Sequence, residues 1–77
     1  MRLDKLPLRQ PARISAIDID SIGVKEAKRL AELGFDEGVA IETLHRGPLL
    51  DPIACRVGRM TIALRRAQAA AVTVELA

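Results

Sequence analysis

The stretch Ile53-Ala-Cys-Arg-Val-Gly-Arg-Met-Thr-Ile-Ala-Leu64 decides the fold, because its turn and its side-chain alternation agree. Gly58-Arg59 is typical of a two-residue hairpin turn with glycine first. Such a turn fixes the register of the strands on either side. In that register one face collects the apolar side chains Ile53, Cys55, Val57, Met60, Ile62 and Leu64. The stretch therefore predicts an antiparallel hairpin, 53–57 with 60–64, that buries one face.

Three more strands are predicted outside this hairpin. Residues 12–19 are rich in isoleucine, but the spacing of Ile14 and Ile17 breaks strict alternation and predicts a bulge near Ser15-Ala16. The other two strands are 39–46 and 72–76.

One helix is predicted over 21–33. Apolar residues recur there at three- and four-residue spacing: Val24, Ala27, Leu30, Ala31 and Leu33. Asp20 or Ser21 is expected to cap the start, and Gly34 stands where a left-handed C-terminal cap is needed.

The remaining segments are connections. The prolines of residues 3–11 favour an extended segment, and Pro48 and Pro52 make 47–52 a loop. Residues 65–71 are expected to form about one helical turn. About five short strands and one helix in 77 residues predict a single mainly-β domain, 1–77, curled into a small barrel that removes its sheet edges.

Composition excludes several classes of protein. The chain has 49% hydrophobic residues, a formal charge of +2 and one cysteine, which cannot form an internal disulfide. Phe35 is the only aromatic residue, so base-stacking nucleic-acid modules and polyproline-binding grooves are excluded. The charged start of the chain argues against a signal peptide, and no apolar run suits a membrane span. The single His45 has no evident Ser or Asp to orient it, so no catalytic residue is assigned and an enzyme is not expected.

Three short motifs resemble the ferrous iron transport protein A family (FeoA). They are Arg29-Leu-Ala-Glu-Leu-Gly34 with the later Gly38, the loop Gly47-Pro-Leu-Leu-Asp-Pro52, and Ile62-Ala-Leu-Arg65. The loop is similar to the family's Pro-Leu-Gly-Asp-Pro, with Leu50 in place of Gly. Glu37 stands where the family often has Pro, and Gly58 is displaced by one position from the family's hairpin glycine.

The resemblance implies an SH3-like barrel and a cytoplasmic accessory protein of ferrous iron uptake. Its implied partner is the cytoplasmic part of the membrane transporter FeoB. The alternative is a regulatory or metal-sensing module of the kind fused to metal-dependent repressors. A small RNA-binding barrel is a third hypothesis, weakened by the missing aromatics.

Two groups of residues are candidate metal ligands, and each has a structural explanation. His45 is expected roughly opposite Cys55, and soft ligands facing each other could begin a metal site; the alternative is a rim histidine and a buried small cysteine. Asp18 and Asp20 could hold a hard cation, or they could simply favour the helix start. We assign no metal site and no cofactor, with weak transition-metal binding left open.

Two surface features are candidates for partner binding. The adjacent Leu49 and Leu50 at a loop tip could dock a partner or fold back over the barrel end. One basic group, near the hairpin, contains Arg56, Arg59, Arg65 and Arg66, and another, on the helix, contains Lys25, Lys28 and Arg29. These groups could meet an acidic partner surface, nucleic-acid phosphates or anionic lipid, or they could be a solvated face on which Lys28 pairs with Glu32. The predicted partner-binding residues are Leu49, Leu50, Arg29 and Arg65.

Overall fold

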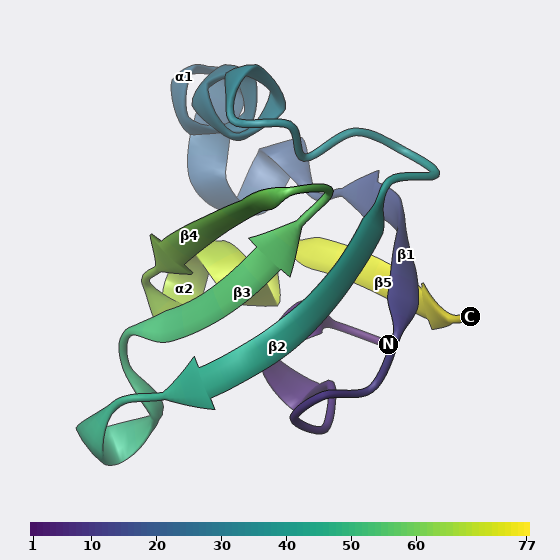
Figure 1. Ribbon diagram of the computed structural model, residues 1–77. Coiled ribbons are helices and arrows are strands. Elements are labelled where there is room, and N and C mark those ends of the chain that lie inside the picture. The colour runs from purple at the N-terminus through teal and green to yellow at the C-terminus, as the bar shows by residue number, and fades with distance from the viewer.

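The computed structural model describes all residues, 1–77, as one curled antiparallel sheet with helical segments at its ends (Figure 1). The strands are β1 (Ala12–Ile17), β2 (Ala40–Arg46), β3 (Ile53–Val57), β4 (Met60–Leu64) and β5 (Val72–Leu76). The helical elements are η1 (Leu3–Lys5), α1 (Ile19–Glu32), η2 (Pro48–Leu50) and α2 (Arg66–Ala70). The strands lie in the order β4-β3-β2-β1-β5, which confirms five strands and one main helix.

The predicted hairpin is confirmed residue by residue. Val57 pairs with Met60, Cys55 with Ile62 and Ile53 with Leu64. Gly58 has φ +58°, as glycine in the first turn position requires. The bulge in β1 is also confirmed, because its register against β5 shifts between Ile14 and Ala16.

Helix α1 differs from its predicted start. It begins at Ile19, and Asp18 is the N-cap without a side-chain cap bond, so capping by Asp20 or Ser21 is wrong. The Ser21 hydroxyl instead donates to the Asp18 carbonyl at 3.1 Å. Gly23 is not helical (φ 86°, ψ 160°) and interrupts the helix. The predicted apolar residues all follow this break, but Val24 is 74% exposed and Ala31 is also exposed, so only part of the predicted apolar face is buried.

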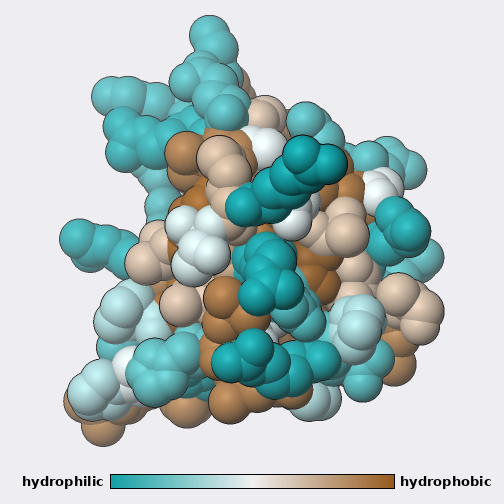
Figure 2. Space-filling view, viewed as in Figure 1, coloured by the Kyte–Doolittle hydropathy of each residue, from teal (hydrophilic) through white to brown (hydrophobic).

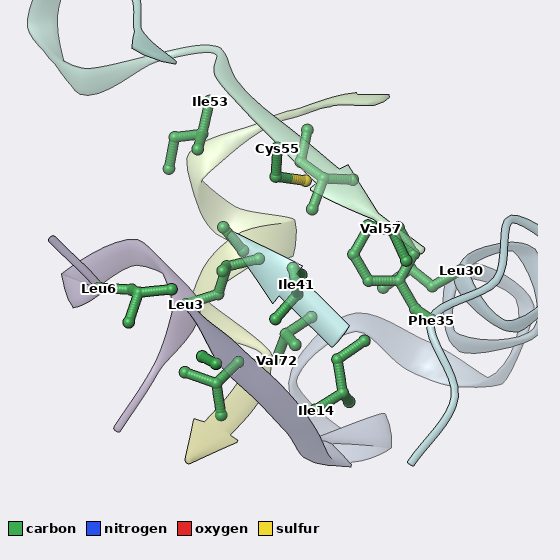
Figure 3. Close-up of a cluster of buried hydrophobic side chains, with 14 residues drawn as sticks. Leu3, Leu6, Ile14, Leu30, Phe35, Ile41, Ile53, Cys55, Val57 and Val72 are labelled. Atoms are coloured by element: carbon green, nitrogen blue, oxygen red, sulfur yellow. The ribbon is translucent and has the colours of Figure 1, made fainter. Parts of the chain in front are cut away.

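The end of α1 follows the prediction. Gly34 has φ +101° and donates its N–H to Ala31 at 3.0 Å, while the Phe35 N–H reaches the Leu30 carbonyl at 3.0 Å. These two bonds satisfy helix-end carbonyls in the arrangement of a left-handed glycine cap. They also bring Phe35 back over the helix into the core beside Leu30 and Val57 (Figure 3).

The prolines predicted an extended N-terminal segment, and this prediction is wrong for its first residues. Residues 3–5 form a 3-10 turn that places Leu3 and Leu6 in the core, both fully buried. Figure 3 shows them at the end of the cluster away from Leu30. The core therefore lies inside the curled sheet, with the N-terminal segment at one end and α1 at the other.

The two outer edges of the sheet are treated differently. No pairing closes the sheet between β4 and β5, so the expectation that the barrel removes its edges is wrong in this respect. The N-terminal residues cover the edge of β5, where Arg2 bridges Thr73 and the Val74 N–H donates to Met1 at 2.7 Å. β4 has only β3 as a neighbour.

Candidate interaction surface

The loop between β2 and β3 is held closed by its own backbone. Gly47 donates to the Pro52 carbonyl at 2.8 Å, and the Leu50 N–H donates to Gly47 at 3.0 Å. A side chain at position 47 would stand 2.8 Å from the Asp51 carbonyl oxygen, so only glycine fits this turn. These contacts give the loop a defined conformation, and its tip projects from the sheet (Figure 1).

Leu49 and Leu50 occupy this tip and point to solvent. Their exposed fractions are 91% and 54%, and neither leucine belongs to the buried core, which favours the docking alternative over a leucine that folds back over the barrel end. Both have left-handed backbones, with φ 59° and 65°. This conformation costs a residue other than glycine about 1–2 kcal/mol. The loop therefore holds two apolar side chains in water on a strained backbone, a combination that points to a functional contact.

The loop is tied to the start of α2. The Asp51 carboxylate accepts the backbone N–H of Arg66 at 3.0 Å. The side-chain oxygen of Gln68 accepts the backbone N–H of Arg65 at 2.9 Å. The N–H groups of Arg65 and Arg66, which have no partner inside the helix, are therefore both hydrogen-bonded. The two arginines consequently stand beside the leucine loop in a fixed place.

A basic hollow of about 550 Å³ lies between the loop, α2 and the N-terminal segment. We use this name for the surface lined by Arg2, Asp4, Lys5, Leu50, Asp51, Arg65, Arg66, Ala67 and Ala70. Arg2 is bound by Asp4 at 3.0 Å, whereas Lys5, Arg65 and Arg66 form no ion pair. The hollow is therefore an exposed cationic site next to the apolar loop tip.

Leu50 and Arg65 are thus brought together, as lining residues of one hollow. Arg2 and Lys5, which also line it, were missed in the sequence because their position depends on how the N-terminal segment packs. Arg29 lies on α1, at the other side of the molecule from the loop, and pairs with Glu26 at 3.7 Å (Figure 1). Figure 2 shows apolar surface at the lower left, where the loop projects.

The other charged residues near the hairpin and on the helix mostly face solvent. Arg56 pairs with Glu42 at 2.7 Å, so it does not contribute a free charge to the predicted basic group. Lys28 forms no ion pair with Glu32.

His45 and Cys55 do not face each other. The register of β2 against β3 shifts between Thr43 and His45, so His45 lies opposite Ala54 and Cys55 opposite Thr43. Cys55 is fully buried, and this burial raises the pKa of its thiol to about 11. Its sulfur contacts the Ile62 carbonyl oxygen at 3.5 Å. Cys55 is thus a core thiol in its protonated form at neutral pH.

Asp18 and Asp20 are both exposed, and no three His, Cys, Asp or Glu side chains come together as a set that could hold a metal ion. Neither α1 nor α2 has the length and apolar character needed to cross a bilayer.

The family of the chain is decided by a match over nearly its whole length. The model of the FeoA domain family matches residues 1–76. The chain belongs to the FeoA domain family. This confirms the family resemblance seen in the three sequence motifs.

Similar proteins agree with this assignment. A fusion protein of Fe(2+) transport protein A and the Fe(2+) transporter FeoB from Porphyromonas gingivalis is 37% identical over 76 residues, which are 99% of this chain and 9% of that protein. Iron(II) transport protein A of Clostridium thermocellum is 34% identical with a TM-score of 0.88, over 99% of this chain and 45% of that one. The chain therefore spans less than half the length of these relatives.

A third similar protein is FeoA from Stenotrophomonas maltophilia, solved in complex with zinc and described as a prokaryotic SH3 domain protein. It is 32% identical with a TM-score of 0.82, over 97% of this chain and 89% of that one. The fold is thus the small SH3-like barrel of FeoA proteins, a family of ferrous iron transport.

Proposed function

We propose that this FeoA protein is a non-catalytic, cytoplasmic accessory component of ferrous iron uptake that docks onto the cytoplasmic part of a FeoB-type transporter. The observation that carries the proposal is the fusion in Porphyromonas gingivalis, where a segment similar to 99% of this chain shares one polypeptide with FeoB. A covalent link supplies a high effective concentration, which is useful between domains that associate. The separate chain would need a contact surface for the same association.

The leucine loop and the basic hollow supply a surface suited to this role. Each leucine contributes about 1.5–3 kcal/mol when it is moved fully out of water. The free cations Lys5, Arg65 and Arg66 would speed and orient the encounter with an acidic partner surface. Because the loop is exposed, its side chains can be replaced without opening the core.

The test is a pair of measurements on the double variant Leu49→Ser and Leu50→Ser. A binding isotherm against the purified cytoplasmic domain of the cognate transporter should weaken at least about tenfold, or about 1.4 kcal/mol. The melting temperature should stay close to that of the parent, because neither leucine belongs to the core.

Val24→Ser is the matched control, since it removes another exposed apolar side chain, on α1. It should leave binding unchanged. Parent-like binding by the double variant would rule out the loop as the docking surface. Absence of binding by the parent itself would rule out the proposed function.

A further inference from the structure

β4 presents an open hydrogen-bonding edge. The tight turn makes Val57 and Met60 a hydrogen-bonded pair, and such pairs alternate along an antiparallel ladder. Ile62 and Leu64 therefore also bond to β3, whereas the N–H and C=O groups of Thr61 and Ala63 point away from it. Both residues are exposed, and no backbone partner meets them.

The edge lacks the devices that usually prevent strand pairing. Residues 60–64 include no charged residue and no proline, and their pairing with β3 has no bulge. The opposite edge of the sheet, in contrast, is covered by the N-terminal residues. The sheet thus protects one edge and leaves the other able to accept a strand.

Charges at the two ends of β4 define what kind of strand would fit. Arg59 and Arg65 flank the strand, are exposed and form no ion pair. At about 3.3 Å per residue they stand about 20 Å apart along an extended chain. A second copy paired antiparallel about Ile62 would set Arg59 against the Arg65 of its partner, and like charges would repel. Charge complementarity favours a different strand, with acidic residues at its ends.

We propose that β4 accepts an extended segment of a protein partner as a sixth strand, with uncharged residues at its centre and acidic residues at its ends that meet Arg59 and Arg65. The inference rests on the proposed function in taking the cytoplasmic part of the transporter as that partner. Arg65 directly follows β4 and also lines the basic hollow, so one partner can contact both surfaces.

Amide hydrogen exchange read by NMR tests the proposal on the protein with and without the purified cytoplasmic domain of its transporter. In the free protein the Thr61 and Ala63 amides should exchange much faster than those of Ile62 and Leu64. In the complex their exchange should slow at least about a hundredfold, as for amides that enter a ladder.

Ala63→Pro tests the same edge by mutation. It removes the N–H of residue 63, which points away from β3, and breaks no hydrogen bond between β4 and β3. It should weaken binding at least tenfold while the melting temperature stays near that of Ala63→Ser, which keeps the amide. A complex in which Thr61 and Ala63 exchange as in the free protein would overturn the added strand and leave the proposed function standing. No complex at all would overturn both, and concentration-dependent protection in the free protein would show a second copy as the occupant instead.

Discussion

The backbone N–H of Phe35 donates to the carbonyl oxygen of Leu30 at 3.0 Å, and both side chains lie in the core. One glycine cap therefore ends α1 and sets the only aromatic ring of the chain against the only buried residue of the helix. This pair attaches α1 to the core together with Ile22 and Leu33, which are partly buried against it. Val24, one expected member of the apolar face, is exposed.

Leu30→Ala should lower the free energy of unfolding by about 2–5 kcal/mol, since it leaves a cavity beside Phe35. Chemical denaturation monitored by circular dichroism measures the loss. Val24→Ala is the control and should change stability by less than about 0.5 kcal/mol. Equal effects of the two substitutions would contradict the burial of Leu30.

Thr43→Val should raise stability by about 1–2 kcal/mol. Thr43 is fully buried, and its Oγ1 atom has no hydrogen-bond partner. A buried hydroxyl without a partner costs about 1–3 kcal/mol, and valine keeps nearly the same shape without it. The comparison is Thr43→Ser, which retains the hydroxyl, loses a methyl group and should be less stable than the parent. A valine variant less stable than the parent would show that the hydroxyl is satisfied in solution.

The sequence predicted the elements that are specified locally. Gly58-Arg59 fixes a turn and hence a register, and Gly34 ends a helix, so both could be recognised from neighbouring residues alone. The N-terminal turn could not, because prolines masked the three-residue spacing of Leu3 and Leu6, the signal of a helical turn with one buried side.

The candidate interaction surface could be predicted from the sequence only in part. Exposure of Leu49 and Leu50 follows from a short proline-bounded loop. The offset of His45 from Cys55 was not predictable, because the bulge in β2 has no local signal in a stretch that otherwise alternates. The basic hollow depends on Arg2 and Lys5 meeting Arg65, which only the packing of distant segments determines.

Stability should fall as pH rises from about 9 to about 11, through Cys55. Burial raises the pKa of this thiol from 9.0 to about 11. The unfolded chain therefore loses the proton first, which favours unfolding in this window. The loss is at most about 2.7 kcal/mol, at about 1.36 kcal/mol for each pKa unit. Unfolding curves across pH 8–12 for the parent and for Cys55→Ala separate the contribution of this thiol. If the free energy of unfolding changed with pH equally in the two proteins, the raised pKa would be contradicted.

Ferrous iron should find no saturable site of micromolar affinity in the isolated protein. His45 is exposed opposite Ala54, Cys55 is a buried thiol, and Asp18 and Asp20 have no third ligand beside them. Anaerobic titration calorimetry measures this directly. A stoichiometric site that disappears in a His45→Ala and Cys55→Ala double variant would overturn this view of both residues.

Leu50→Gly should raise stability while it weakens docking. Leu50 has φ 65°. The resemblance of the loop to the FeoA motif implies that the family usually has glycine at this place. Glycine removes a backbone cost of about 1–2 kcal/mol. The greater conformational freedom of glycine in the unfolded chain lowers the free energy of unfolding by about 0.5–1 kcal/mol. The net gain in unfolding free energy should be about 0.5–1 kcal/mol. Transporter binding should fall by less than in the double leucine variant, because Leu49 remains.

Denaturation and a binding isotherm on the same preparation check both effects. Leu50→Val is the control, because a β-branched residue is worse in a left-handed backbone and should lower stability. If Leu50→Gly were instead less stable than the parent, the contacts of the partly buried leucine would outweigh its strain. The side chain would then hold the loop against the basic hollow, and Leu49 alone would remain as the apolar docking contact.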